Sequence, residues 1–206
     1  MCGFGGIINS NQNHRSADLE AIAKKVKFRG PDNTSVVIYD SEFNAVEEGP
    51  TGIFFNRLAI IDLAERANQP FEDEDCLLVF NGEIYNYQNL RTQLENKGVR
   101  FHTTSDTEVL FYLLKHYGTH AISKLNGMFS FCFINKGQKS FIVARDRLGI
   151  KPLYYKQNES GFVFGSELKS IALLSPEENS ISSNAIQAYL ALQYIPTPLT
   201  IYNEIK

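Results

Sequence analysis

The segment from Met128 to Ile134 constrains the fold of this chain most strongly, because all of its side chains but Ser130 are apolar, on both faces. In an extended strand, alternate side chains point to opposite sides of the sheet. Three phenylalanines therefore share one face of the segment, and Met128, Cys132 and Ile134 share the other. A strand that is apolar on both faces is typically buried on both. The fold must therefore place a layer of structure against each side of the sheet that contains this strand.

Turn residues and apolar periodicity predict the other elements. Turn clusters at 135–138 and 159–161 each join two apolar segments and predict β-hairpins. Further strands are predicted at 2–9, 36–39, 52–58 and 77–80, and helices at 17–27, 87–97, 167–174 and 184–194. Hairpins with helices between them argue against a parallel βαβ fold. We therefore expect an α+β protein with two mainly antiparallel sheets packed together and helices outside.

Two helix starts carry capping residues. Ser16 precedes apolar residues at helical spacing and is expected to cap the helix over 17–27. Ser105 and Glu108 have the spacing of a capping box, in which each side chain bonds the main chain of the other residue. This pair predicts a further helix, which Gly118 is expected to end.

Composition excludes several classes of protein. At 206 residues, the chain is long enough for one domain, or for one domain with an attached fragment. Its 20 basic and 23 acidic side chains give a net charge of −3, whereas nucleic-acid binders usually carry a basic excess. The basic cluster at 24–29 is expected at a helix C-terminus, where cations complement the helix dipole. We therefore expect no nucleic-acid partner.

The chain carries no targeting or membrane signal. No run approaches 18 apolar residues, and no charged segment precedes an apolar stretch at the N-terminus. These patterns predict a cytoplasmic protein without a membrane partner. The stretch at 195–198 has the composition of a linker, and the chain stops soon after it. We therefore expect a fragment of a longer protein.

Metal and phosphate sites are not predicted. The three cysteines lack C-x-x-C spacing, and the four histidines lack the spacing of metal ligands. Neither G-x-x-x-x-G-K-[ST] nor G-x-G-x-x-G occurs, so no phosphate-binding loop is expected. The sequence predicts no cofactor for this chain.

Cys2 is a candidate nucleophile. Removal of Met1 would leave a thiol and a free α-amine on one residue. The amine titrates near pH 7.7–8.0 and a free thiol near 8.5, so the amine can accept the thiol proton. We therefore expect active protein to begin at Cys2. The alternative is that Cys2 is only a small buried residue near the start of the chain.

Asn81 and Gly82 allow two interpretations. Asn-Gly between apolar pairs is a strong signal for a type I′ hairpin turn. The segment that follows predicts a helix rather than a long return strand. The functional alternative is an oxyanion hole, with the Asn81 side-chain amide and the Gly82 N–H as donors.

Arg57 and Asp106 are candidates for recognition of an amino acid. The planar fork of an arginine suits a carboxylate, although Arg57 could equally pair with an acid for structural reasons. Asp106 could bind a substrate ammonium group, or serve only as an acid in the first turn of a helix.

The motifs gain specificity from their order along the chain. They are Cys2-Gly3, Arg29–Asp32, Arg57–Ile60, Phe80–Asn86, Ser105–Glu108 and Arg145–Tyr154. As a set they resemble the N-terminal glutaminase domain of the glutamine-hydrolysing asparagine synthetases, which are class II glutamine amidotransferases. The resemblance runs from Cys2 to about Leu174. One departure is Phe28, where the family usually has histidine.

The resemblance implies a four-layer αββα sandwich of the N-terminal-nucleophile hydrolase type. It implies that Cys2 is the nucleophile and that Asn81 and Gly82 form the oxyanion hole. Substrate glutamine would be bound through its carboxylate by Arg57 and through its amine by Glu83 and Asp106. The residues implied to line the pocket are Leu58, Ala59, Ile60 and Ile61.

The resemblance also implies a division of labour. Residues 2–190 would form the glutaminase domain, and 191–206 the linker and start of a missing C-terminal synthetase domain that uses ATP and magnesium. Ammonia from glutamine would convert aspartate to asparagine, and a homodimer is possible. The alternatives are amidation of another carboxylate, such as a polysaccharide precursor, or a catalytically silent glutamine-sensing or scaffold module.

Overall fold

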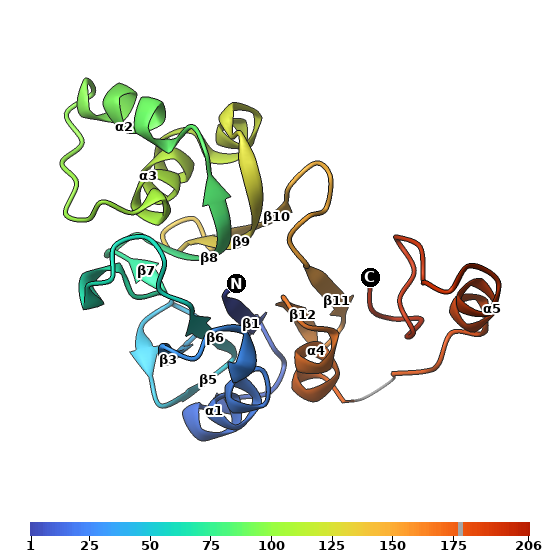
Figure 1. Ribbon diagram of the computed structural model, residues 1–206. Helices are drawn as coiled ribbons and strands as arrows, with labels where there is room; N and C mark the ends of the chain where they lie inside the picture. The colour runs from blue at the N-terminus through green and yellow to red at the C-terminus, as the bar shows by residue number, and fades with distance from the viewer. Residues whose placement is uncertain (177–178) are drawn as a thin grey trace. The chain divides into compact units, whose positions relative to one another are not determined.

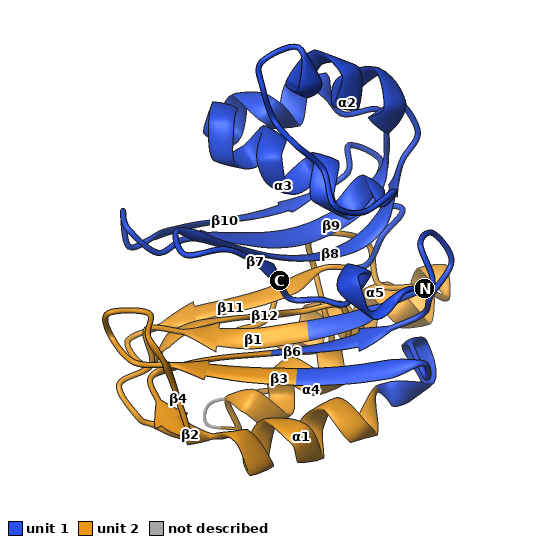
Figure 2. Ribbon diagram, turned by 90° about the vertical axis from the view of Figure 1, so that its left-hand side faces the viewer, with its two compact units in different colours: residues 1–4, 27–35, 54–152 blue, residues 5–26, 36–53, 153–206 orange. Residues whose placement is uncertain are grey.

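The computed structural model describes residues 1–176 and 179–206 (Figure 1). These residues fall into two compact units, which Figure 2 shows in different colours. Unit 1 comprises 1–4, 27–35 and 54–152, and unit 2 comprises 5–26, 36–53 and 153–206. Among the described helices, none has the length and apolar character needed to cross a membrane.

Unit 1 contains a four-stranded sheet in the order β10-β9-β8-β7. Its strands are β7 (Phe71–Glu72), β8 (Cys76–Ile84), β9 (Gly127–Asn135) and β10 (Ser140–Arg145), and its neighbouring strands are antiparallel. The α-helices of this unit are α2 (Tyr87–Glu95) and α3 (Asp106–Tyr117), and its short 3₁₀ helices are η1 (Lys27–Arg29), η2 (Glu65–Ala67) and η3 (Gly118–Lys124). In Figure 1, α3 lies beside β8, with which it makes many contacts.

The core of unit 1 confirms that β9 is buried on both faces. Its three phenylalanines pack into a cluster with Leu110 and Leu114 of α3 and Leu90 of α2. On the opposite face of the same strand, Cys132 and Ile134 are also fully buried. Alternation along one strand thus places apolar side chains on both sides of the sheet.

Unit 2 contains most of a six-stranded sheet in the order β11-β12-β1-β6-β3-β4. The strands are β1 (Gly3–Ile8), β3 (Asn33–Tyr39), β4 (Ala45–Val46), β6 (Thr51–Arg57), β11 (Tyr154–Asn158) and β12 (Gly161–Gly165), and β2 (His14–Arg15) pairs separately with β5 (Glu48–Gly49). The helices are α1 (Ser16–Lys25), α4 (Leu168–Leu174) and α5 (Ser183–Leu192). The two predicted hairpins, β9–β10 and β11–β12, are confirmed, as is the α+β class with mainly antiparallel sheets.

Three local expectations are corrected. Ser16 is the first residue of α1, and Arg15 occupies the cap position without a side-chain bond. Ser105 caps α3 by accepting from the Thr107 N–H at 3.1 Å, but the Glu108 carboxylate does not complete the capping box. It accepts instead from the N–H groups of His102 and Thr103. Glu108, three residues after the cap, thus accepts hydrogen bonds from the loop before the helix rather than from the cap residue.

The third correction concerns Asn81 and Gly82. β8 runs unbroken through both residues to Ile84, and its whole length pairs with β9. The hairpin interpretation of Asn-Gly is therefore wrong. Gly82 is required by a close approach instead, because a Cβ atom there would lie 2.3 Å from the Met128 carbonyl oxygen. Asn-Gly resembles a turn only locally, and the long β9 partner holds it extended.

Candidate active site

A cavity of about 190 Å³ lies within unit 1. It gathers nine of the ten residues predicted from the sequence to act in a site, from the N-terminus, the end of β6, β8 and the start of α3. They are Cys2, Arg57, Leu58, Ile60, Ile61, Asn81, Gly82, Glu83 and Asp106. Among the described residues, Ala59 is the predicted one that does not line the cavity; its N–H donates to Asp32 at 2.8 Å.

The Cys2 thiol lies against the main chain at the end of β6. The Leu58 N–H donates to its Sγ over 3.4 Å, and the Sγ lies 3.7 Å from the Leu58 carbonyl oxygen. Burial raises the pKa of the Cys2 thiol, while the Leu58 N–H, the charged amine of Met1 and the charges of Arg57 and Lys151 limit this rise. A main-chain donor and three positive charges thus favour the thiolate, which is the nucleophilic form.

The Arg29–Asp32 motif holds the main chain of Cys2 and of the end of β6 in place. Arg29 Nε donates to the Cys2 carbonyl oxygen at 3.1 Å, and the Asp32 N–H donates to the Arg57 carbonyl oxygen at 3.0 Å. Gly30 lies so close to Asn56 that a Cβ atom would come within 2.2 Å of its carbonyl oxygen. Phe28 is 73% exposed and, in the described structure, does not line the cavity. The motif therefore holds the nucleophile and the end of β6, and the change at Phe28 leaves the lining intact.

Strand alternation directs the Asn81 side chain into the site. Leu78 and Phe80 belong to the core beneath α3, so Asn81 and Glu83 point to the opposite face, where both line the cavity. Asn81 is 1% exposed, and its side-chain Nδ2 has no hydrogen-bond partner within the described ranges. A buried donor without a partner is costly, so its retention here indicates a missing acceptor in the cavity.

The Gly82 N–H lies on the open edge of β8. The N–H groups of Phe80 and Ile84, two residues before and after, are taken by Gln69 Oε1 and the Asp106 carboxylate rather than by β9. Phe129, opposite Gly82, directs its own N–H and C=O to Asp146. The Gly82 N–H therefore points to the same open edge between Gln69 and Asp106, with no partner in the part of the chain that the structure describes.

Arg57 lines the cavity and also holds the loop that follows it. Its guanidinium group donates to the carbonyl oxygens of Asp62 and, at 3.1 Å, Ala64, and to Asn68 Oδ1 at 2.7 Å. It is 6% exposed. The 58–68 loop is thus wrapped around this side chain, and an incoming carboxylate would share the guanidinium with the loop.

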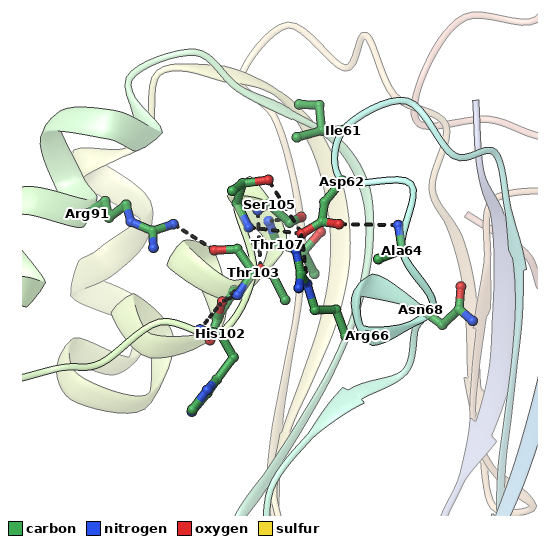
Figure 3. A network of polar contacts seen from close by, with 12 residues as sticks. Ile61, Asp62, Ala64, Arg66, Asn68, Arg91, His102, Thr103, Ser105 and Thr107 are labelled. Atoms are coloured by element: carbon green, nitrogen blue, oxygen red, sulfur yellow. Dashed lines mark hydrogen bonds and ion pairs between the residues drawn. The ribbon is translucent and has the colours of Figure 1, made fainter.

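Asp62 also holds this loop, and Figure 3 shows its carboxylate beside Ala64 and Arg66. The carboxylate accepts from the Thr104 N–H at 3.0 Å and from Arg66 Nε at 3.4 Å. The Thr104 N–H lowers the pKa of the Asp62 carboxyl, so the anion persists at neutral pH. The loop and the segment before α3 are therefore joined beside the cavity, a link that sequence reasoning missed because 42 residues separate its partners.

Asp106, the first residue of α3, is a buried carboxyl group in the cavity wall. Its Oδ2 accepts from the Ile84 N–H at 2.9 Å. Burial raises the pKa of the Asp106 carboxyl to about 6, against the effect of the main-chain donors at Ile84 and Thr107, and the charge of Glu83 adds to the rise. Asp106 is therefore ionised at neutral pH and can bind a cationic amine.

We expect Asp106→Asn to raise the stability of the protein at pH 7 and to weaken its binding of substrate. Because the folded pKa lies above 3.8, the folded state keeps the proton longer, and wild-type stability should fall as pH rises from about 4 to about 6. Asn has no such penalty, so the variant should be more stable at pH 7, by at most about 3 kcal/mol. The KM for glutamine should rise about tenfold or more, since a charged hydrogen bond is lost. Urea unfolding and steady-state kinetics measure these effects.

Asp75→Asn is the matched control, because its carboxylate pairs with Lys115 outside the cavity. It should leave the KM unchanged. A wild-type KM in Asp106→Asn would mean that Asp106 serves only to start α3.

Sequence reasoning did not assign several other lining residues to the site. They are Met1, Ala67, Gln69, Phe80, Ser105, Thr107, Met128 and Lys151. Gln69 orders the strand edge, since its side chain bonds both the N–H and the C=O of Phe80. Phe80, Ser105, Thr107 and Lys151 lie within motifs singled out in the sequence, so membership of a motif was the available signal for these four.

Comparisons with known proteins agree with this geometry. Residues 1–206 match a family described as a glutamine amidotransferase domain. The chain is 41% identical over its full length to "Asparagine synthetase [glutamine-hydrolyzing] 1" of Bacillus subtilis (strain 168). It is 34% identical over 98% of its length to "Putative asparagine synthetase [glutamine-hydrolyzing] 2" of Methanocaldococcus jannaschii. It spans only 32% and 41% of the lengths of these two relatives.

A solved structure shares the fold. Glutamine phosphoribosylpyrophosphate amidotransferase from B. subtilis, complexed with ADP and GMP, matches with a TM-score of 0.66 at 25% identity. The match covers 84% of this chain and 43% of that one. This likeness confirms the expected α+β sandwich of the N-terminal-nucleophile hydrolase type.

Proposed function

Because this chain belongs to the glutamine amidotransferase domain family, we propose that it hydrolyses L-glutamine to glutamate and ammonia at Cys2. One observation carries the proposal for the site. Among the described residues, the buried Asn81 amide and the Gly82 N–H both lack partners, and both residues line the cavity that holds the Cys2 thiol. Two preorganised donors beside a nucleophile suit the oxyanion of an acyl-transfer intermediate.

The proposed reaction has two covalent steps. The α-amine of Cys2, free once Met1 is removed, takes the thiol proton, and the thiolate attacks the side-chain carbonyl carbon of glutamine. The resulting oxyanion accepts bonds from Asn81 and Gly82. The intermediate collapses as the ammonium group returns its proton to the leaving nitrogen, and ammonia departs. Water then attacks the thioester and gives one proton to the amine. The second tetrahedral intermediate expels the Cys2 thiolate, which takes this proton back from the ammonium group, and glutamate is released with its acid proton passing to solvent.

The charged residues that line the cavity would orient the substrate. Arg57 would bind the glutamine carboxylate, with Glu83 and Asp106 bound to the α-ammonium group. Leu58, Ile60 and Ile61 would contact the substrate along the 58–68 loop. The placement of all six in one cavity supports this assignment, and the bonds of Arg57 to the loop imply that the loop adjusts when the carboxylate arrives.

We further propose that ammonia made here is used in asparagine synthesis by a C-terminal part of the protein. The lengths of the curated relatives, about two and a half to three times that of this chain, support such a part. ATP and magnesium would bind there. Exposed apolar residues along α5, including Ile186, Tyr189 and Leu190, supply a surface for it to cover. The three free cysteines favour the reducing cytoplasm as the compartment.

The test is to assay the 206-residue chain for both reactions. It should release ammonia from glutamine, make no asparagine when ATP and aspartate are added, and show no heat of ATP binding by calorimetry. A chain of the relatives' full length should make asparagine from glutamine. Absence of ammonia release in protein that begins at Cys2 would favour a silent glutamine-sensing module. Ammonia release without asparagine in the full-length protein would favour another carboxylate acceptor.

A further inference from the structure

The segment after β10 is a loop of fixed geometry that the proposed reaction does not yet use. The Asp146 carboxylate accepts from the N–H groups of Leu148, Ile150 and Lys151, at 3.2, 2.9 and 3.0 Å. Arg145 holds the outside of the loop, donating to the Gly149 carbonyl oxygen and, from Nε, to the Lys151 carbonyl oxygen at 2.6 Å. Two of these five bonds go to the N–H and the C=O of Lys151 itself, so they fix the main chain of this residue on both sides.

Among the residues that the structure describes, Lys151 is a buried cation without a partner. It is 5% exposed and lines the same cavity as Cys2. Within residues 1–176 and 179–206, its ammonium group makes neither an ion pair nor a hydrogen bond. Lysine is almost never this buried unless it is paired, because desolvation of the charge is costly. The charge therefore has a use inside the cavity.

We propose that Lys151 is a positioning residue of this site, whose ammonium group stabilises negative charge on the Cys2 sulfur. The proposal rests on the proposed function and deepens it. The Arg145–Pro152 loop would thus hold the positive charge of Lys151 in the cavity of the nucleophile.

The other charges around the thiol show why one cation matters. Burial raises the pKa of the Cys2 thiol, and Lys151 is among the charges that limit the rise. Two carboxylates, Glu83 and Asp106, also line the cavity, so loss of Lys151 removes one of the positive charges that offset them. The groups that face the thiol are Arg57 from β6, Glu83 from β8, Asp106 from α3, Lys151 from the loop, the terminal amine, and Arg29 through the Cys2 carbonyl oxygen.

The test measures thiol reactivity rather than turnover. Iodoacetamide, a neutral reagent, is used to alkylate Cys2 from pH 6 to 10, and peptide mass spectrometry gives the rate at each pH. Lys151→Met keeps the length and apolar stem of the side chain but removes its charge. We expect its labelling curve to move to higher pH and its rate at pH 7 to fall about tenfold, since thiolate is the reactive form. Lys151→Arg should restore the wild-type curve.

Lys97→Met is the matched control, because it removes a positive charge from an exposed position over the Tyr117 ring, outside the cavity. It should leave the curve unmoved. An unmoved curve in folded Lys151→Met, with or without a raised KM, would overturn the proposal; a raised KM alone would assign Lys151 to the glutamine carboxylate. If thermal melting shows that Lys151→Met is misfolded, the labelling curve of Lys151→Gln is measured instead and decides in the same way. The glutaminase assay of unmodified protein tests the proposed function separately.

Discussion

Cys2→Ala is expected to abolish ammonia release from glutamine while the protein stays folded. The thiol is the only nucleophile that the proposed route uses, and alanine leaves no atom that could form the thioester. The side chain is half-buried and bonds only the Leu58 main chain among the described residues, so its loss should cost little stability. Cys2→Ser should be nearly as inactive, because a hydroxyl ionises far less readily than a thiol. Ammonia detection coupled to glutamate formation measures the effect.

The other two cysteines supply the control for this prediction. Cys76 and Cys132 are buried, and burial raises the pKa of the Cys76 thiol to about 11 and that of Cys132 further, so neither forms a thiolate at neutral pH. A glutamine analogue that carries an electrophile should therefore label Cys2 alone. Intact mass should show that active protein starts at Cys2, since an amide nitrogen cannot act as the base. Full activity in Cys2→Ala, or in protein that keeps Met1, would refute the mechanism.

Asn81→Ala is expected to lower kcat by about 10²–10³, with a smaller change in the KM for glutamine. The Asn81 amide would bond the oxyanion more strongly than the ground-state carbonyl, so its loss raises the barrier more than it weakens binding. The folded protein should not suffer, because Nδ2 has no partner among the described residues that the substitution could strand. Initial rates across glutamine concentrations separate kcat from KM.

Ser130→Ala is the matched control for Asn81. Ser130 lies opposite Asn81 in the β8–β9 ladder, is fully buried, and its hydroxyl also lacks a partner in the described ranges. It does not line the cavity in the described structure. If removal of a buried polar group from this ladder were enough to disturb the site, both variants would lose activity equally. A loss confined to Asn81→Ala identifies the amide itself as the donor.

Local patterns predicted elements whose causes are local. The apolar residues on both faces of β9, the turn residues between β11 and β12, and the Ser105 cap of α3 all act within a few residues, and the structure confirms them. Asn81-Gly82 was ambiguous for the same reason. Its neighbours favour a turn, and pairing with a strand more than 40 residues away keeps it extended.

The sequence by itself determined the class of fold and assembled the candidate residues in order along the chain, because periodicity, turn chemistry and motifs are written in neighbouring positions. Only the tertiary structure decided how those residues are used. It turns the Gly82 N–H to an open strand edge, commits the Arg57 guanidinium partly to the 58–68 loop, and brings Lys151 into the cavity of Cys2. These outcomes bring together residues as many as 149 positions apart, such as Cys2 and Lys151, which line one cavity only when the chain closes on its core.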